Sequence, residues 1–185
     1  MTHRTHRRAS TLISLALGAA LLLGACSSAG SDPADSDAGS GSGSGGGVSV
    51  ADGPTADLDF TAQTVDGDSF DGGQLAGKPT VLWFWAPWCS TCRAQSSAVS
   101  ALAETYDGRV NVVGVGGLAD SSAIVDYARE VTAPTQLIDP DGAVWRHFGV
   151  RAQSSYVVID ADGTVVRDGY LDDRVLADLV DELVA

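Results

Sequence analysis

Two cysteines, Cys89 and Cys92, directly follow a strongly apolar segment, and this arrangement limits the possible folds more than any other feature of the chain. The segment from Thr80 to Trp85 has the continuous apolar character of a central strand that is covered on both faces. We expect a helix from about Thr91, which puts Cys89 at a helix N-terminus, where unpaired N–H groups and the helix dipole stabilise a thiolate. Cys92 then lies one turn into the helix, close enough to attack a mixed disulfide formed by Cys89. The spacing predicts an attacking and a resolving cysteine.

The first 25 residues are predicted to be an export signal. They contain Arg4, Arg7 and Arg8 and then an apolar run from Leu12 to Leu23, which is shorter than the roughly 20 residues a spanning helix needs. The run ends in the residues Leu-Leu-Gly-Ala before Cys26, a pattern that resembles the lipobox of bacterial lipoproteins. That resemblance implies cleavage before Cys26 and acylation of its thiol, so that the protein is lipid-anchored to the outer face of the cell membrane. The alternative is an ordinary signal peptide with a cysteine just beyond its cleavage site.

The rest of the chain divides into a linker and a folded part. Residues 26–54 are almost entirely Ser, Gly, Asp and Ala, a composition typical of a flexible tether. Residues 55–185 have the length of one domain with one core. The formal charge of −13 becomes −16 when the three arginines of the signal are removed, and such an acidic surface repels phosphate backbones, so nucleic acid is not an expected partner.

Metal binding and hydrolysis fit the residues less well than thiol exchange. A structural zinc site needs about four ligands, whereas the processed chain would offer Cys89, Cys92 and His147 alone once Cys26 is acylated. We therefore expect no metal and no other cofactor. His147 falls at the end of a predicted short helix over 143–148 and is interpreted as a partly buried structural imidazole, which argues against hydrolases that need a histidine base beside the nucleophile. A purely structural role for the disulfide is unattractive because so small a loop constrains the unfolded chain little.

Apolar runs and turn residues predict an α/β fold with a mixed central sheet flanked by helices. The last helix is expected to be capped by Asp172. Its apolar face is expected to comprise Val175, Leu176, Leu179, Val180 and Leu183. Strands are expected over 58–65, near 70, over 80–85 and 110–115, around 137, and over 156–159 and 164–167, with helices from about 91, over 121–130 and over 143–148.

The segment from Val81 to Cys92, with Trp-Cys-x-x-Cys after an apolar strand, resembles the active-site signature of thioredoxin-like proteins. From about Phe60 to the end, the chain resembles the TlpA/ResA/DsbE branch of that family. The resemblance implies a thioredoxin fold with an N-terminal β extension, an exposed attacking sulfur on Cys89 and a redox-active Cys89–Cys92 disulfide. It implies supporting positions around the disulfide at Pro87, Trp88, Ser90, Thr91, Gln153 and Ser154.

Two positions depart from the family pattern. Trp83 stands where cytoplasmic thioredoxins have a buried Asp that assists proton transfer, so a water or another carboxylate, for example Glu104, is expected to replace it. Ser154 stands at the place of the family's cis-proline. Because a cis bond before a residue other than proline costs about 3–4 kcal/mol, the loop around Ser154 is expected to be strained or trans. The serine also admits a hydroxyl close to sulfur.

These features predict an extracytoplasmic thiol-disulfide oxidoreductase that exchanges disulfides with exported proteins. Oxidation is the expected direction, because dithiols outside the cell tend to be oxidised and no further cysteine of the processed chain could supply electrons. The first alternative is reduction of apocytochrome c thiols before haem attachment, which would require a membrane redox partner. An alternative of another class is a Cu(I)-binding or assembly module, since soft thiolates suit Cu(I).

Overall fold

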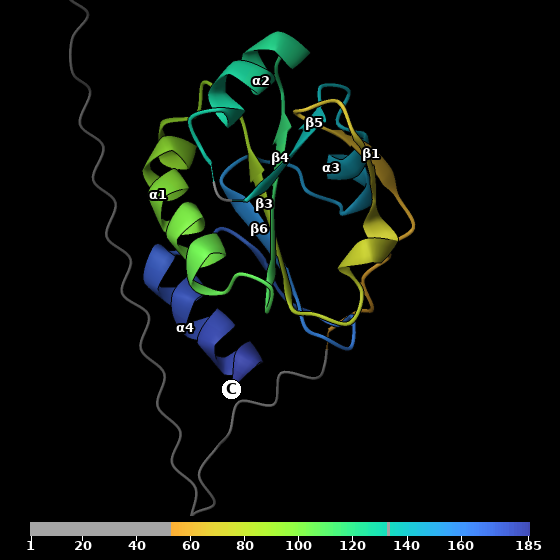
Figure 1. The fold of residues 1–185 in the computed structure, drawn as a ribbon, viewed down its shortest axis with the longest axis vertical. Helices are drawn as coiled ribbons and strands as arrows, with labels where there is room; N and C mark the ends of the chain where they lie inside the picture. The colour runs from red at the N-terminus through yellow and green to blue at the C-terminus, as the bar shows by residue number, and fades with distance from the viewer. Residues whose placement is uncertain (1–52, 133) are drawn as a thin grey trace, which may run out of the picture. The chain divides into compact units, whose positions relative to one another are not determined.

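The computed structural model describes residues 53–132 and 134–185, which form a seven-stranded mixed sheet with helices on both faces (Figure 1). This architecture confirms the predicted α/β class with an N-terminal β extension. The predicted signal peptide, Cys26 and most of the predicted tether lie outside the described residues. The strands are β1 (Thr61–Thr64), β2 (Ser69–Asp71), β3 (Thr80–Trp85), β4 (Asn111–Gly117), β5 (Thr135–Asp139), β6 (Ser155–Ile159) and β7 (Val165–Gly169). The helices are the short 3-10 helix η1 (Gly72–Leu75) and the α-helices α1 (Ser90–Thr105), α2 (Ser121–Ala128), α3 (Ala143–His147) and α4 (Asp173–Val184).

The strand order, β2-β1-β5-β4-β3-β6-β7, places β3 near the middle of the sheet. Strands β3, β4 and β5 run parallel, while β6 runs antiparallel to β3 and β7 antiparallel to β6. The extension joins the other side, because β1 pairs antiparallel with both β2 and β5. The carboxyl ends of β3 and β4 and the start of β6 therefore meet at one edge of the sheet, where the cysteines follow β3.

Side chains of β3 alternate between two hydrophobic clusters, one on each face of the sheet. Trp83 and Trp85 enter the cluster that includes both cysteines and apolar residues of α1, α2 and α4. Leu82 and Phe84 enter the cluster that includes residues of α3, β2 and η1. Figure 1 shows the corresponding layers, with α1 and α4 along one side of the sheet and α3 along the other. All six residues of β3 are buried, as predicted for a central strand.

The strand β4 continues to Gly117, two residues beyond its predicted end at Val115. Glycine is depleted in strands, but here its missing side chain makes room for the tryptophan of the neighbouring strand. A Cβ atom at Gly116 would lie 2.6 Å from the Trp85 ring and 2.6 Å from Ile124. Trp85 and Ile124 therefore require a glycine at position 116, and the Trp145 ring, 2.7 Å from a Cβ atom at Gly117, requires one there.

Helix α4 differs from its prediction at two residues. Asp172 occupies the N-cap position, but its side chain makes no capping hydrogen bond and instead accepts one from the hydroxyl of Tyr170. Val175 is 45% exposed, whereas Leu176 is 1% exposed. The buried stripe comprises Leu176, Leu179 and Val180, with Leu183 partly buried against it. This stripe has the i, i+3, i+4, i+7 spacing, and Val175 precedes it by one residue, a rotation of about 100° around the helix.

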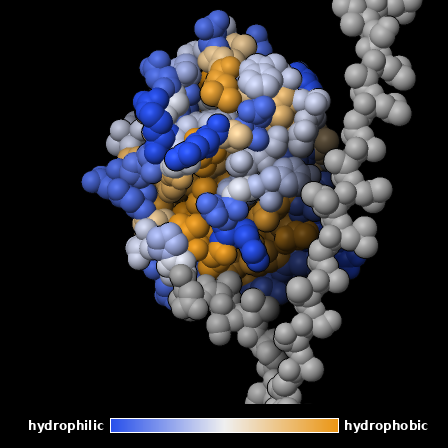
Figure 2. All heavy atoms as spheres, turned by 180° about the vertical axis from the view of Figure 1, so that it is seen from behind, coloured by the Kyte–Doolittle hydropathy of each residue, from blue (hydrophilic) through white to orange (hydrophobic). Residues whose placement is uncertain are grey.

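Figure 2 shows the face opposite to that of Figure 1, where hydrophilic residues surround an apolar area in the lower half of the view. The most exposed large apolar side chains are those of Trp88, Leu118, Tyr170 and Val175. Within 53–132 and 134–185, no helix has the length and apolar character needed to cross a membrane.

The neighbouring pair Leu176 and Val175 tests how α4 packs. We expect Leu176→Ala to lower the free energy of unfolding by about 2–5 kcal/mol, because it leaves a cavity between the helix and the sheet. Val175→Ala is the matched control and is expected to change it by less than about 0.5 kcal/mol, since the side chain faces solvent. Urea unfolding followed by tryptophan fluorescence measures both, and similar losses for the two variants would contradict this packing.

Candidate active site

The chain turns sharply from β3 into α1, and this turn holds the cysteines. The N–H of Cys89 donates to the carbonyl of Ala86 at 3.1 Å. Cys89 is the N-cap residue of α1, and its Sγ accepts a hydrogen bond from the N–H of Cys92 at 3.0 Å. The first turn of α1 contains no acidic residue, so the positive end of the helix dipole at Cys89 is not offset by a carboxylate there. This environment favours a thiolate on Cys89.

The two sulfurs differ in their access to solvent. Cys89 and Cys92 are joined as a disulfide, and Cys89 is 5% exposed whereas Cys92 is fully buried. Cys89 is therefore the less buried of the two residues, but it is not the exposed attacker that the family resemblance implied. The structure thus brings the two predicted residues together with the asymmetry expected of an attacking and a resolving cysteine.

Ser154 reaches the disulfide from the loop before β6. Its Oγ lies 3.2 Å from Sγ of Cys89 and 3.4 Å from Sγ of Cys92. No cis peptide bond occurs among the described residues, and Ser154 has a left-handed φ of 66°. A residue other than glycine in this region carries strain of about 1–3 kcal/mol. The peptide bond before Ser154 is therefore trans, and the strain lies in the backbone dihedral angle of Ser154.

A buried glutamine that the sequence did not single out supports this loop. Gln95 is 3% exposed; its Oε1 accepts a hydrogen bond from Nε1 of Trp83 at 3.0 Å, and its Nε2 donates to the carbonyl of Ser154 at 3.4 Å. Gln95 follows Cys92 by three residues on α1, so both point to the same face of the helix. The sequence did contain a signal for this role: Gln95 is a polar residue three positions after Cys92, and Trp83, at the position of the family's Asp, needs a hydrogen-bond acceptor when buried.

The exposed tryptophan beside Cys89 is held by the loop after β4. Trp88 is 60% exposed, and its Nε1 donates to the carbonyl of Leu118 at 3.0 Å. The carbonyl of Pro87 accepts a hydrogen bond from the Arg93 guanidinium at 3.1 Å. The other predicted supporting residues also lie near the disulfide in the chain: Ser90 and Thr91 are exposed in the first turn of α1, and Gln153 is half-buried before Ser154.

Two other predicted residues lie away from the disulfide. Glu104 is exposed near the C-terminal end of α1, about 18 Å along the helix from Cys92, so its proposed role as a replacement for the family's Asp is wrong. His147 is half-buried on α3, where its Nε2 lies 2.7 Å from the carbonyl oxygen of Asp57 and its ring packs 5.5 Å from that of Phe60. This agrees with a structural imidazole.

Trp85 packs inside the core, and its Nε1 donates a hydrogen bond to the side chain of Gln136.

Tyr156 belongs to the same core cluster as the cysteines, and it is uncharged. Its side chain is fully buried. Its hydroxyl has no hydrogen-bond partner in the described part of the chain, and burial raises the pKa of Tyr156 well above its usual range. Among the described residues, the polar partners of the sulfurs are the N–H of Cys92 and the hydroxyl of Ser154. Both of these partners are uncharged dipoles, so the direct hydrogen bonds to the sulfurs come from neutral groups.

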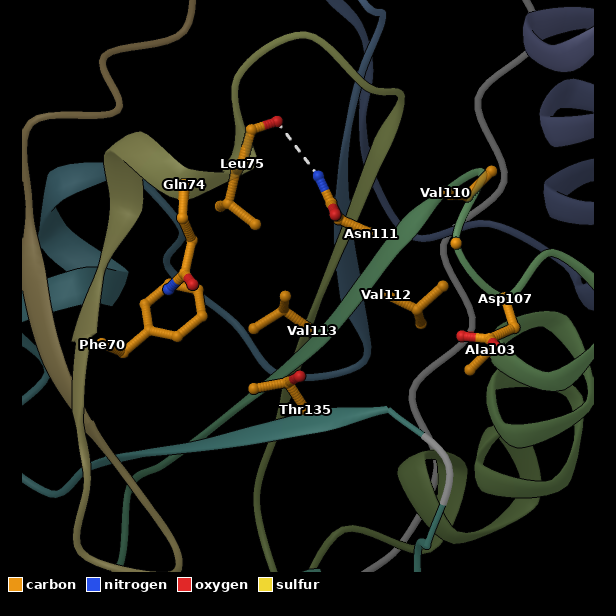
Figure 3. A pocket seen from close by; sticks show the side chains of 11 residues that line it. Phe70, Gln74, Leu75, Ala103, Asp107, Val110, Asn111, Val112, Val113 and Thr135 are labelled. Carbon is orange, nitrogen blue, oxygen red and sulfur yellow. Dashed lines mark hydrogen bonds between the residues drawn. The ribbon is translucent and has the colours of Figure 1, made fainter.

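A cavity of about 300 Å³ lies at the other end of the sheet (Figure 3). It is lined by Val110, Asn111, Val112 and Val113 at the start of β4, with Leu75 and Thr135 opposite. The cysteines follow the far end of β3, which runs parallel to β4. Asn111 donates a hydrogen bond to the carbonyl of Leu75 there, and the cavity contains none of the residues around the disulfide.

Comparison with known proteins places the chain in a family. The family described as Redoxin matches residues 51–183, which include all the described strands and helices except the last residue of α4. The chain belongs to the Redoxin family. The thiol:disulfide interchange protein DsbE of Pseudomonas fluorescens biotype C is 34% identical over 131 residues, which cover 68% of this chain and 70% of that protein. The predicted resemblance to DsbE-type proteins is thereby confirmed.

Two mycobacterial proteins are more similar in sequence. The soluble secreted antigen MPT53 of Mycobacterium tuberculosis is 41% identical over 108 residues, which cover 58% of this chain and 62% of MPT53. The chain thus spans less than two thirds of the length of MPT53. The solved structure of MTB dsbF in its mixed oxidised and reduced forms is 41% identical with a TM-score of 0.64, and the match covers 68% of this chain and 96% of that one. These likenesses confirm the thioredoxin-like fold.

Replacement of Gln95 tests its support of the loop. We expect Gln95→Met to lower the free energy of unfolding by about 1–3 kcal/mol, because the buried Nε1–H of Trp83 loses its acceptor. Ser97→Ala, at an exposed position of the same helix, is the control and is expected to change stability by less than about 0.5 kcal/mol. Urea unfolding compares the two, and a Gln95→Met protein as stable as the control would show that Trp83 does not depend on Gln95.

Proposed function

We propose that this protein is an extracytoplasmic thiol-disulfide oxidoreductase that oxidises thiols of exported proteins through Cys89 and Cys92. The observation that carries the proposal is the disulfide at the N-terminus of α1, in which Cys89 is the N-cap residue and the less buried of the two cysteines. The names of the relatives support it, since DsbE is called a thiol:disulfide interchange protein and MPT53 a secreted antigen. The expected export signal supports the same compartment.

The exchange proceeds in two balanced steps. A thiolate of the partner protein attacks Sγ of Cys89, a new disulfide forms between the two, and the Cys89–Cys92 bond breaks with its electron pair on Sγ of Cys92. A second thiolate of the partner then attacks the partner sulfur of the mixed disulfide and releases Cys89 as a thiolate. Two partner thiolates become one disulfide, the enzyme disulfide becomes a dithiol, and protons are taken from solvent.

Cysteine variants separate the two roles. We expect both Cys89→Ser and Cys92→Ser to abolish oxidation of reduced ribonuclease, because neither variant can hold the Cys89–Cys92 disulfide that is consumed. With scrambled, disulfide-containing ribonuclease, the Cys89 thiolate of Cys92→Ser attacks a substrate disulfide, and the resulting mixed disulfide is expected to accumulate as thiol-sensitive adducts in gels, because Cys92 is no longer there to attack Sγ of Cys89. Ser97→Ala is the control and should retain wild-type turnover. Wild-type turnover by either cysteine variant would exclude this mechanism.

The reduction potential distinguishes oxidation from the alternative of reducing apocytochrome c thiols. The protein is equilibrated with glutathione buffers and its thiols are trapped, with Cys26→Ser as background so that trapping reports Cys89 and Cys92 alone. A potential near or above about −180 mV supports an oxidant, and one well below about −250 mV supports a dedicated reductant. Stoichiometric Cu(I) binding without turnover of protein thiols would instead support the binding or assembly module.

Lipid anchoring through Cys26 belongs to the same proposal and has its own test. The residues before Cys26 match the lipobox pattern, and an acyl anchor with a tether over 26–54 would keep the domain near the membrane. When the full chain is produced in a bacterial host with labelled palmitate, we expect label on the wild-type protein and none on Cys26→Ser. Equal release of both proteins as soluble, unlabelled chains would show that the signal is an ordinary one.

A further inference from the structure

The hydroxyl of Ser154 is the one side-chain group among the described residues that lies within hydrogen-bonding distance of both sulfurs. We propose that Ser154 is a third catalytic residue, which donates a hydrogen bond to whichever of the two sulfurs carries the negative charge during exchange. This role rests on the proposed function of the Cys89–Cys92 pair and adds a residue other than cysteine to the reacting groups.

The surroundings of Ser154 fix its backbone and leave its hydroxyl for the sulfurs. Its N–H donates to the carbonyl of Phe84 at 3.0 Å, and its own carbonyl accepts a hydrogen bond from Gln95. The side chain is 8% exposed. The hydroxyl lies 3.2 Å from one sulfur and 3.4 Å from the other, so a rotation of its O–H bond, without movement of the loop, transfers the hydrogen bond between them.

The backbone of Ser154 is strained in a way that glycine would relieve. Its φ of 66° lies in the left-handed region, which glycine enters without steric hindrance. Strain of this kind clusters at functional sites, where the surrounding structure holds it in place. A serine in this conformation, with its hydroxyl directed at the sulfurs, is accounted for by a function of that hydroxyl.

The hydroxyl can follow the charge through the reaction. When a partner thiolate bonds to Cys89, the electron pair of the broken disulfide moves to Sγ of Cys92, and Ser154 donates to that thiolate. When the second partner thiolate releases Cys89, the negative charge appears on Sγ of Cys89, and Cys92 has taken a proton from solvent. Ser154 then donates to Cys89. The serine keeps its own proton throughout, so the electron and proton balance is that of disulfide exchange.

A thiolate is a stronger acceptor than a disulfide sulfur, because hydrogen bonds to ionised groups are the stronger class. The hydroxyl therefore stabilises the reduced, charged form more than the oxidised form. It shifts the equilibrium with glutathione toward reduced enzyme, which makes the disulfide more oxidising. This is the direction that the proposed function requires.

The test removes the hydroxyl in two ways. Ser154→Gly removes it and relieves the backbone strain, and Ser154→Ala removes it and keeps the strain. Ser155→Ala is the control, since Ser155 is the next residue, at the start of β6. All are made with Cys26→Ser, and three quantities are measured: the midpoint pH of Cys89 alkylation, the equilibrium constant with glutathione, and the urea unfolding midpoint.

Both Ser154 variants are expected to raise the alkylation midpoint by about one pH unit, a tenfold loss of thiolate stabilisation. Both should shift the glutathione equilibrium about tenfold toward oxidised enzyme, which corresponds to about 30 mV. The control should change neither quantity. Unchanged midpoints and equilibria in both Ser154 variants, with altered unfolding alone, would overturn the proposal and leave Ser154 a structural residue.

The same measurements separate this proposal from the proposed function. A wild-type protein that oxidises reduced ribonuclease while both Ser154 variants keep its alkylation midpoint and glutathione equilibrium would refute the role of the serine alone. A wild-type protein without turnover, in which the two Ser154 shifts are nevertheless seen, would overturn the oxidant function and support the hydrogen bond.

Discussion

All six side chains of β3 are buried, alternating between the two faces of the sheet, and this burial fixes where the chain leaves the sheet. A shift of β3 by one residue would move every side chain to the opposite face of the sheet. The register of β3 is therefore fixed, and with it the position of Ala86 and of the turn that leads into α1. Cys89 therefore caps α1 beneath the loop that carries Ser154, and the reactive disulfide depends on the packing of a strand that contains no reactive group.

The fold and the cysteines could be predicted from the sequence because their signals are local. A continuous apolar strand, a helix start and two cysteines at fixed spacing lie within a short segment, and each signal has a direct physical meaning. Errors arose where distant residues decide the outcome. The last two residues of β4, Gly116 and Gly117, lie against the rings of Trp85 and Trp145, and the exposure of Val175 depends on which face of α4 meets the sheet.

The buried polar residues of the site were only partly predictable. The sequence shows that Trp83 replaces an acid and that Ser154 replaces a proline, but not what compensates for these changes. The compensation is the contact of Gln95 with both, which requires α1, β3 and the loop before β6 to meet. Glu104 was a poor substitute because it lies about 18 Å along α1 from Cys92, whereas Gln95 lies less than one turn from Cys92 on the same face.

The close contact between Gly116 and Trp85 limits how relatives of this chain can diverge. A Cβ atom at Gly116 would meet both the indole ring and Ile124, so a side chain at that position becomes acceptable only after the tryptophan has been replaced by a smaller residue. The two positions should therefore covary, and the order of substitutions matters: loss of the large ring comes first. The core that contains the cysteines is thus constrained by volume as well as by chemistry.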